Sequence, residues 1–407
     1  MSSLQPALPY KYPRVFWIMC LGAMSFFLSF NIILPELAQE LRSKGGAAYV
    51  GWIIPAFSFS ALIARPFSGW ITDNLGRRWA MIGGCLFCII AGCFYPMVTT
   101  AMGFLIVRAI HGFSTGFTPT GFTAFTADVV AESHRGRAMG WQGMFNNLGT
   151  TIGYALGAII ALHFGVDILY YTSAALASLA WLLFMSLPET RTVSNRKEFV
   201  FNIRNLFYFP AWRPSFIMFL VCISLGSILT VMSDFTLEMG YTNKGLFLSI
   251  YIGVSLLFRL ISGRVSDALG RAWSTAIGTA AQVLSMSILV YMSIRLQHQH
   301  QTHCSTCELP GLFWFASSAI LYGIGQGFNA PSLFAWASDT ADNHHRGRAL
   351  AMLFMFLELG IIVGGLTANY FIQGMSWNYV GIFGLSGSAF FIALGFSLYC
   401  LRYKHQR

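Results

Sequence analysis

Long apolar segments alternate with short polar connections along the whole 407-residue chain. Each of the first four is close to the ~20 residues that an α-helix needs to cross a hydrocarbon core of ~30 Å. These four are Phe16 to Pro35, Val50 to Ile71, Trp79 to Val98 and Leu105 to Ala127. The pattern continues at roughly 138–163, 166–187, 213–236, 245–266, 273–294, 311–338, 349–373 and 377–401. It therefore predicts an all-α integral membrane protein with about twelve transmembrane helices.

Composition and the placement of charge support this reading. Hydrophobic residues make up 56% of the chain and charged residues 10%, whereas soluble domains carry roughly 25% charged residues. With the amino terminus inside, the loops predicted to face outward hold only Arg42, Lys44, Lys244 and Arg295, although the net charge is +10. This asymmetry is the positive-inside rule. It predicts a bacterial inner-membrane protein in a lipid bilayer, with both termini cytoplasmic and no nucleic-acid partner.

The chain repeats itself. Residues 64–79 (ARPFSGWITDNLGRRW) align with residues 258–273 (FRLISGRVSDALGRAW), a shift of 194 positions. Residues 115–138 align with residues 326–349, a shift of 211 positions. We expect an amino-terminal six-helix half at 1–187, a cytoplasmic linker at 188–212 and a carboxyl-terminal half at 213–407. Parallel repeats of this kind place a solute site between the halves near the midplane, unless the duplication serves stability alone.

Two inner loops share one spacing of glycine, aspartate and arginine, in Gly69-x-x-x-Asp73-x-x-Gly76-Arg77-Arg78 and Gly263-x-x-x-Asp267-x-x-Gly270-Arg271. The first glycine of each copy can let a neighbouring helix approach closely, and each aspartate can face a helix amino terminus or an arginine. We expect Arg77 to reach Asp128 and Arg271 to reach Asp339, in an ion network that latches the cytoplasmic side. The alternative is that these charges only solubilise the loops.

At these residues the chain resembles the major facilitator superfamily over nearly its whole length. The first copy is similar to the signature of that family between helices two and three, and the second to its weaker repeat. The resemblance implies two pseudo-symmetric six-helix halves that carry a small molecule by alternating access, and no enzymatic activity. A phosphate-binding G-x-x-x-x-G-K-[ST] motif is absent from the sequence, so a proton gradient rather than ATP is expected to drive transport. We expect a monomer without a bound cofactor.

Arg108 lies in the predicted fourth helix, and we place it about mid-depth. A charge at the bilayer centre costs at least about 2.5–3.5 kcal/mol, so it is functional by default. The stretch resembles the helix-four motif of the family, in which an arginine is followed four residues later by glycine (Gly112), and His111 stands where many relatives have glutamine. The resemblance implies that Arg108 faces the cavity for coupling or substrate contact; a structural ion pair is the alternative.

Glu358 is the predicted coupling acid, about two turns from the inner end of helix eleven. A carboxylate isolated in a low-dielectric medium can change its protonation state near neutral pH, although a permanently neutral or hydrogen-bonded Glu358 is the alternative. By the repeat it corresponds to Asn147. We expect Asn31, Asn147, Gln326 and Asn329 to supply neutral hydrogen bonds to the solute. Asp234 and Glu238 are expected to be solvated at the outer end of helix seven.

Glycines recur at four-residue spacing in helix five (Gly149, Gly153, Gly157) and in helix eleven (Gly360, Gly364). Such faces allow close backbone contact, and we expect sliding between the halves along them. The helix-five pattern loosely resembles that of proton-driven antiporters, but neither the residue after Gly153 nor the one after Gly157 is proline. Asn31 also stands where several drug exporters carry an acid.

A loop predicted on the outer face, residues 296–310, contains five potential metal ligands: His298, His300, His303, Cys304 and Cys307. Imidazoles and thiolates at this spacing suit a transition metal. A disulfide between the two cysteines and a merely polar loop are the alternatives.

Together these features predict a secondary transporter, and we favour a proton-coupled exporter of a small organic molecule. Uptake by symport or facilitated diffusion is the nearest alternative, and a narrower version is a carrier of metal-chelating metabolites. A different class is a membrane receptor or metal sensor that keeps the fold without transport.

Overall fold

A computed structural model describes residues 11–131, 134–190, 208–302, 311–341, 346–374 and 379–404. Within these ranges the chain forms helices and no strands. The first half contains α1 (Arg14–Ile32), α2 (Leu37–Ser43), α3 (Ile53–Asn74), α4 (Arg77–Phe94), α5 (Ala101–Val129), α6 (Arg135–Phe164) and α7 (Val166–Met185). The second contains α9 (Trp212–Glu238), α10 (Leu246–Leu269), α11 (Arg271–Thr302), α12 (Leu312–Asp339), α13 (Arg346–Gly374) and α14 (Tyr379–Lys404). Apart from the short α2, these are twelve long helices, as the sequence predicts.

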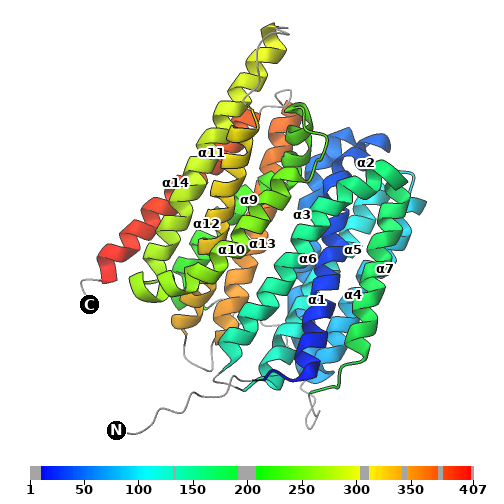
Figure 1. Ribbon diagram of the computed structural model, residues 1–407, viewed down its shortest axis with the longest axis vertical. Coiled ribbons are helices and arrows are strands. Elements are labelled where there is room, and N and C mark those ends of the chain that lie inside the picture. The colour runs from blue at the N-terminus through cyan, green and yellow to red at the C-terminus, as the bar shows by residue number, and fades with distance from the viewer. Residues whose placement is uncertain are drawn as a thin grey trace.

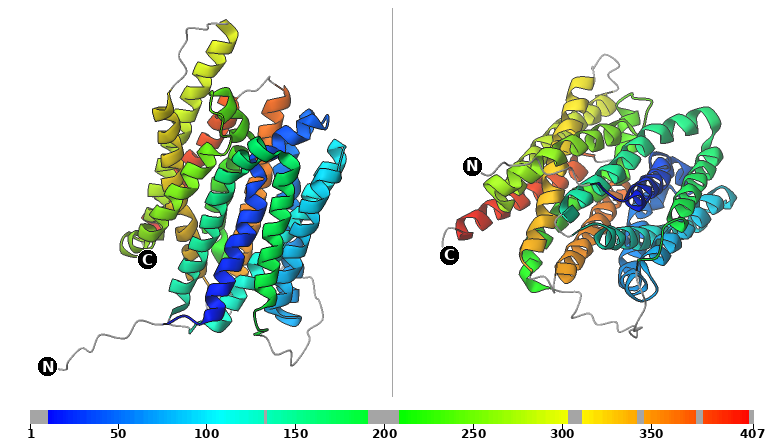
Figure 2. Two further views of the ribbon diagram at one scale, coloured as in Figure 1. Left: turned by 45° about the vertical axis from the view of Figure 1, so that its right-hand side comes forward. Right: turned by 60° about the horizontal axis from the view of Figure 1, so that its bottom comes forward.

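The long helices form two groups of six that lie side by side (Figures 1 and 2). In the first group α1 packs on α6 and α7, and α5 packs on α3 and α4. In the second group α9 packs on α13 and α14, and α12 packs on α10 and α11. Ten helical stretches in the described ranges are long and apolar enough to cross a membrane. The remaining two long helices, α5 and α12, are rich in glycine and polar residues, which lowers their hydropathy.

Two equivalent turns mark one end of the bundle. Gly76 (φ 131°) precedes α4 and Gly270 (φ 93°) precedes α11, and a positive φ of this kind favours glycine. We call this end, at the bottom of Figure 1, the inner end, because the distribution of basic loops predicts that it faces the cytoplasm. The opposite end, which carries α2, is the outer end.

The glycine faces of α6 and α13 pack within each half. A Cβ atom on Gly149 or Gly157 would lie 2.3 or 2.0 Å from a backbone carbonyl oxygen of α1. A Cβ on Gly360 or Gly364 would lie 2.4 or 1.9 Å from a carbonyl oxygen of α9. The prediction of sliding between the halves along these faces is therefore wrong. Spacing identifies a helix face that can be approached closely, but it does not identify the partner helix.

The halves meet along two seams, α3 with α13 and α6 with α10. In the α3–α13 seam the backbone N–H of Gly51 donates to Asn369 Oδ1 at 3.2 Å. In the α6–α10 seam a Cβ on Gly245 would lie 2.0 Å from the carbonyl oxygen of Tyr154. The repeat shift of 194 residues relates Gly51 to Gly245, so the two seams are copies of each other.

Candidate functional site

At the inner end of the first half, Arg77 joins α4 to its neighbours. Its Nε donates to Asp128 Oδ2 at 3.0 Å and its Nη1 to the carbonyl oxygen of Thr72 at 2.7 Å. The carboxylate of Glu189 accepts from the backbone N–H groups of Arg77 and Arg78, at 2.8 and 3.1 Å. A carboxylate at a helix amino terminus stabilises that helix. The sequence did not single out Glu189, and the side chain of Asp73 lies outside the described residues.

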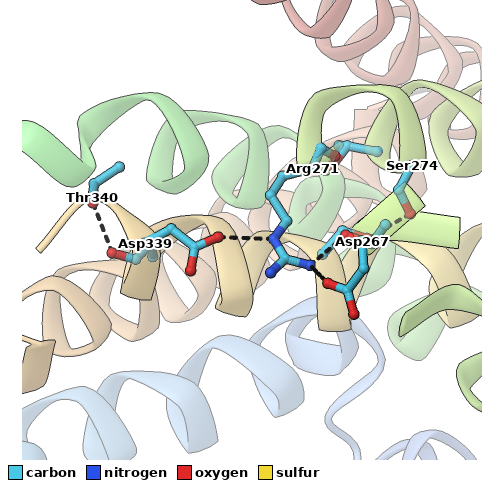
Figure 3. A network of polar contacts seen from close by, with 9 residues as sticks. Asp267, Arg271, Ser274, Asp339 and Thr340 are labelled. Atoms are coloured by element: carbon cyan, nitrogen blue, oxygen red, sulfur yellow. Dashed lines mark hydrogen bonds and ion pairs between the residues drawn. The ribbon is translucent and has the colours of Figure 1, made fainter. Parts of the chain in front are cut away.

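The second half repeats this arrangement at its inner end. Arg271 Nε donates to Asp339 Oδ2 at 2.8 Å, and Nη1 donates to Asp267 Oδ1 at 2.6 Å. Figure 3 shows Arg271 between the two carboxylates. The expected pairs Arg77–Asp128 and Arg271–Asp339 are both present, and in this conformation each holds helices together inside one half.

Gly69 and Gly263 do not stand at a close helix contact. A Cβ atom on either residue would meet nothing within 4 Å. The predicted close approach of a neighbouring helix at these two glycines is therefore wrong, because their spacing within the motif says nothing about which element faces them.

At the outer end, ion pairs join one half to the other. Arg42 of α2 donates to both oxygens of Asp234 in α9, each at 2.7 Å. Lys244, which precedes α10, contacts Glu36 at 2.5 Å and also bonds Gln39. The bidentate contact of Arg42 with Asp234 is of a kind that is among the stronger polar contacts in proteins. The outer ends of the two halves are thus tied together.

We expect Asp234 and Glu238 to be solvated; the structure corrects this for Asp234, whereas Glu238 is half-buried. Asp234 is 8% exposed, within the pair with Arg42. Glu238 Oε1 accepts a hydrogen bond from the hydroxyl of Tyr379 at 2.8 Å. Both acids lie where α9 meets residues far away in the sequence, so the local sequence could not reveal their partners.

Near mid-depth, an ion pair crosses the α3–α13 seam. Arg65 Nη2 lies 3.0 Å from Glu358 Oε1, and the two side chains are 20% and 8% exposed. The guanidinium of Arg65 also lies 4.5 Å from the ring centre of Phe354. Glu358 lies near the middle of α13 (Arg346–Gly374), deeper than expected. It is therefore paired across the two halves rather than isolated.

Sequence reasoning missed Arg65 and its repeat equivalent, Arg259. Each is an arginine near the middle of an apolar span, and the repeat alignment superimposes the two. An intramembrane arginine is functional by default, so the signal was present. Arg259 forms no ion pair with any described residue, and its buried Nε has no hydrogen-bond partner.

Arg108 lies about two turns from the outer start of α5, not at mid-depth. Its side chain is buried, with the residue 2% exposed. Nε donates to the carbonyl oxygen of Ile53 at 3.3 Å, and the guanidinium lies 4.1 Å from the ring centre of Phe57. Nη1 has no hydrogen-bond partner, and no described acid pairs with Arg108. The structural ion pair considered from the sequence is not present among the described residues.

His111 lies in the core of the first half. Its residue is fully buried, with Nε2 3.1 Å from Cys88 Sγ and Nδ1 3.4 Å from the hydroxyl of Tyr95. Cys88 Sγ in turn lies 3.2 Å from Ser29 Oγ. These contacts connect α1, α4 and α5, so the predicted cavity role of His111 is wrong in this conformation.

Asn31 and Asn329 also pair within their own halves. Asn31 Nδ2 donates to the carbonyl oxygen of Phe27 at 2.7 Å and to Thr150 Oγ1 of α6 at 3.3 Å. Asn329 is fully buried, and its Nδ2 donates to Gln282 Oε1 of α11 at 2.5 Å. Their polar groups therefore stabilise helix pairs, which corrects the prediction that they contact solute.

Gln326 and Asn147 remain compatible with contact to a solute. Gln326 is half-buried, and its Nε2 donates to the hydroxyl of Tyr322 at 3.4 Å. Asn147 is half-buried on α6, and its Nδ2 has no hydrogen-bond partner.

The proposed metal ligands fall mostly outside the described residues. His298 is exposed near the end of α11, which reaches beyond its neighbours at the outer end (Figure 1). The side chain of His300 and all of His303, Cys304 and Cys307 are not described. Within the described ranges no group of three or more potential ligands could hold a metal ion.

Twelve long helices in two repeated halves, with ion pairs between the halves and arginines within the spans, form the architecture of a membrane transporter. The family described as Major Facilitator Superfamily matches residues 15–296 and 215–406. The chain belongs to this family, and it is a multi-pass membrane transporter rather than an enzyme.

Relatives of this chain include two proteins named for multidrug resistance and one named for export. It is 25% identical to "Multidrug resistance protein 2" of Bacillus subtilis, over 63% of this chain and 68% of that protein. It is 24% identical to "Multidrug resistance protein MdtG" of Escherichia fergusonii, over 88% of each chain. It is 23% identical to "Staphylopine export protein" of Staphylococcus aureus, over 93% of this chain and 94% of that protein.

Solved structures share the fold at low sequence identity. The POT family transporter PepTSo superimposes with a TM-score of 0.77 at 13% identity, over 98% of this chain and 100% of that one. The nucleoside transporter NupG gives a TM-score of 0.72 at 16% identity, over 94% of this chain and 98% of that one. At these identities the likeness concerns the fold alone.

Proposed function

We propose that this chain is a proton-coupled exporter of a small organic solute. The observation that carries the proposal is the ion pair between Arg65 and Glu358, because it joins the two halves near mid-depth. A titratable group at this position links proton binding to the relative position of the halves. In the proposal the protein works as a monomer in the inner membrane, with both termini in the cytoplasm and the proton gradient as its energy source.

The protonation state of Glu358 would bias the conformational equilibrium. While Glu358 is ionised, separation of α3 from α13 leaves two buried charges unpaired, which is strongly unfavourable. A proton on Glu358 removes the charge and most of this penalty. A ligand shifts a two-state equilibrium only through its different affinity for the two states, and a proton on Glu358 meets that condition.

The described conformation suits solute entry from the inner end. The outer end is tied by Arg42–Asp234 and Lys244–Glu36, whereas the described ion pairs of the inner end lie within single halves. In the proposed cycle, solute that binds from the inside offsets the cost of separating Glu358 from Arg65, and the outer pairs then open. Glu358 takes up a proton from the outside while it is separated from Arg65. Release of that proton to the inside restores the pair.

The direction of transport rests on the relatives. Two of them are named for multidrug resistance and one for export. These names support export over uptake for this chain.

Inverted membrane vesicles with an imposed proton gradient test the proposal. Wild-type vesicles should accumulate a fluorescent organic dye supplied outside, and a protonophore should abolish accumulation. Glu358→Gln should abolish it as well, because glutamine keeps the size of the side chain but cannot titrate. Glu40→Gln is the matched control, since it removes a carboxylate from an ion pair with Lys44 inside one half. Accumulation that survives the protonophore or Glu358→Gln would contradict the proposal.

A further inference from the structure

The two seams between the halves differ at their equivalent mid-depth positions. The repeat relates Arg65 to Arg259 and Glu358 to Asn147. The α3–α13 seam therefore holds an arginine and a glutamate, whereas the α6–α10 seam holds an arginine and an asparagine. The second seam has kept its cation and has no carboxylate at the corresponding place.

Arg259 has no counterion in the part of the chain that the structure describes. Its Nε is buried without a hydrogen-bond partner, and so is Nδ2 of Asn147. Both unpartnered groups are donors, and the repeat relates their positions to those of the contacting pair Arg65 and Glu358. An acceptor with negative charge between Arg259 and Asn147 would therefore satisfy both. A charge without a partner within the membrane is unfavourable, and an anionic ligand would remove part of that cost.

The second seam also has space that is filled in the first. Beside Arg65, the ring of Phe354 lies 4.5 Å from the guanidinium. The residue equivalent to Phe354 in the first half is Gly143. A Cβ atom on Gly143 would meet nothing within 4 Å. The α6–α10 seam thus lacks both the carboxylate and the aromatic ring that cover the arginine of the α3–α13 seam.

The charges of the described residues within the membrane spans also favour a negatively charged ligand. Arg65, Arg108 and Arg259 are cations within the spans, and Arg65 pairs with Glu358. Arg108 and Arg259 form no ion pair with any described acid, so these two guanidinium groups remain without a described counterion. A cationic solute would be repelled by this surplus.

We propose that the transported solute is an organic anion whose carboxylate, or an equivalent oxyanion, binds Arg259 beside Asn147. The inference rests on the proposed transport function and names the chemical class of the solute. An arginine binds a carboxylate through two parallel N–H donors, and the amide of Asn147 supplies a further donor. The anion takes the place in the α6–α10 seam that Glu358 occupies in the α3–α13 seam.

Equilibrium binding to the purified full-length protein in lipid nanodiscs tests the inference. The probes are matched in shape and opposite in charge: carboxyfluorescein against rhodamine 6G, and naphthoate against naphthylmethylammonium. We expect at least one anion to bind and its cationic counterpart to bind at least ~10-fold more weakly. Arg259→Gln should weaken anion binding at least ~10-fold. Binding of cations alone, no anion binding, or anion binding that Arg259→Gln leaves unchanged would overturn the inference.

A second variant supplies the carboxylate from the chain itself. Asn147→Glu should pair with Arg259 as Glu358 pairs with Arg65, and it should abolish anion binding while keeping a monodisperse, folded protein. Asn147→Gln has the same length as Asn147→Glu but keeps an amide donor and adds no charge, so it should weaken anion binding far less than Asn147→Glu does. Full anion binding by Asn147→Glu would contradict the proposed position of the anion at Arg259. If Arg259 had only a structural role, Asn147→Glu would not be expected to abolish anion binding.

The outcomes separate this inference from the proposed function. Binding is measured without a gradient, so it does not depend on proton coupling. Anion binding that needs Arg259, in a protein without proton-driven transport, would refute only the proposed function. Proton-driven transport of the cationic probes alone would refute only the anion inference.

Discussion

Replacing Asp234 by asparagine should loosen the outer end of the transporter. In the wild type, Arg42 donates to both carboxylate oxygens of Asp234 at 2.7 Å. Hydrogen bonds to charged groups contribute about 1.5–3 kcal/mol. Because the Arg42 side chain is 28% exposed, we use the lower part of that range, about 1.5–2 kcal/mol. The outward-open population should then rise about 10–30-fold.

The rate of modification of a buried cysteine measures this population. Thr230 lies one turn before Asp234 and lines a small space between the halves at the outer end. In a background with serine at Cys93, Cys304 and Cys307, Thr230→Cys should react slowly with an impermeant thiol reagent added outside. Adding Asp234→Asn should increase the reaction rate about 10–30-fold.

A matched control separates this effect from general loosening. Glu40→Gln breaks the ion pair between Glu40 of α2 and Lys44, the residue that follows α2. This pair lies within one half, so the variant should leave the reaction rate of Thr230→Cys unchanged. An unchanged rate with Asp234→Asn, or an equal increase with Glu40→Gln, would refute the idea that Arg42–Asp234 holds the outer end closed.

Three further predictions address orientation, packing and the buried cation. A cysteine at Ser43 should react with an impermeant reagent from outside the cell and one at Leu75 should not; the reverse result in whole-cell labelling would invert the topology. Gly157→Ala should lower the free energy of unfolding of the purified protein by about 1–3 kcal/mol, because the new Cβ meets a carbonyl oxygen at 2.0 Å. Gly140→Ala, whose Cβ meets nothing within 4 Å, should not lower it, since alanine favours the helix more than glycine does. Arg108→Ala should weaken binding of the anionic probes and Arg108→Lys should restore little of it, since an ammonium does not reproduce a planar guanidinium; undiminished binding in both would exclude Arg108 from the site.

The fold was predictable because its signals are local or repeated. Apolar segments of membrane-spanning length predict the helices, and the aligned copies at 64–79 and 258–273 predict two equivalent halves. The turns at Gly76 and Gly270 follow from the same motif.

The candidate site was only partly predictable, because helix spacing identifies a face but not what covers it. Asn31, Asn329 and His111 are polar residues at membrane depth, yet each bonds a neighbouring helix of its own half. The partner of Glu358 is 293 residues away, in Arg65. The repeat aligned Arg65 with Arg259 and Glu358 with Asn147, but it could not show that Arg65 contacts Glu358 across the α3–α13 seam.

Separation of exchange from accumulation in proteoliposomes tests the central claim most directly. Purified wild type and Glu358→Gln are reconstituted with an anionic probe that binds the wild type, and the pH gradient and membrane voltage are set separately. We predict that Glu358→Gln still exchanges labelled for unlabelled probe. When a pH gradient is imposed, it should no longer accumulate the probe against the concentration gradient of the probe. Gradient-driven accumulation by Glu358→Gln at the wild-type level would contradict the account and remove Glu358 from the coupling mechanism.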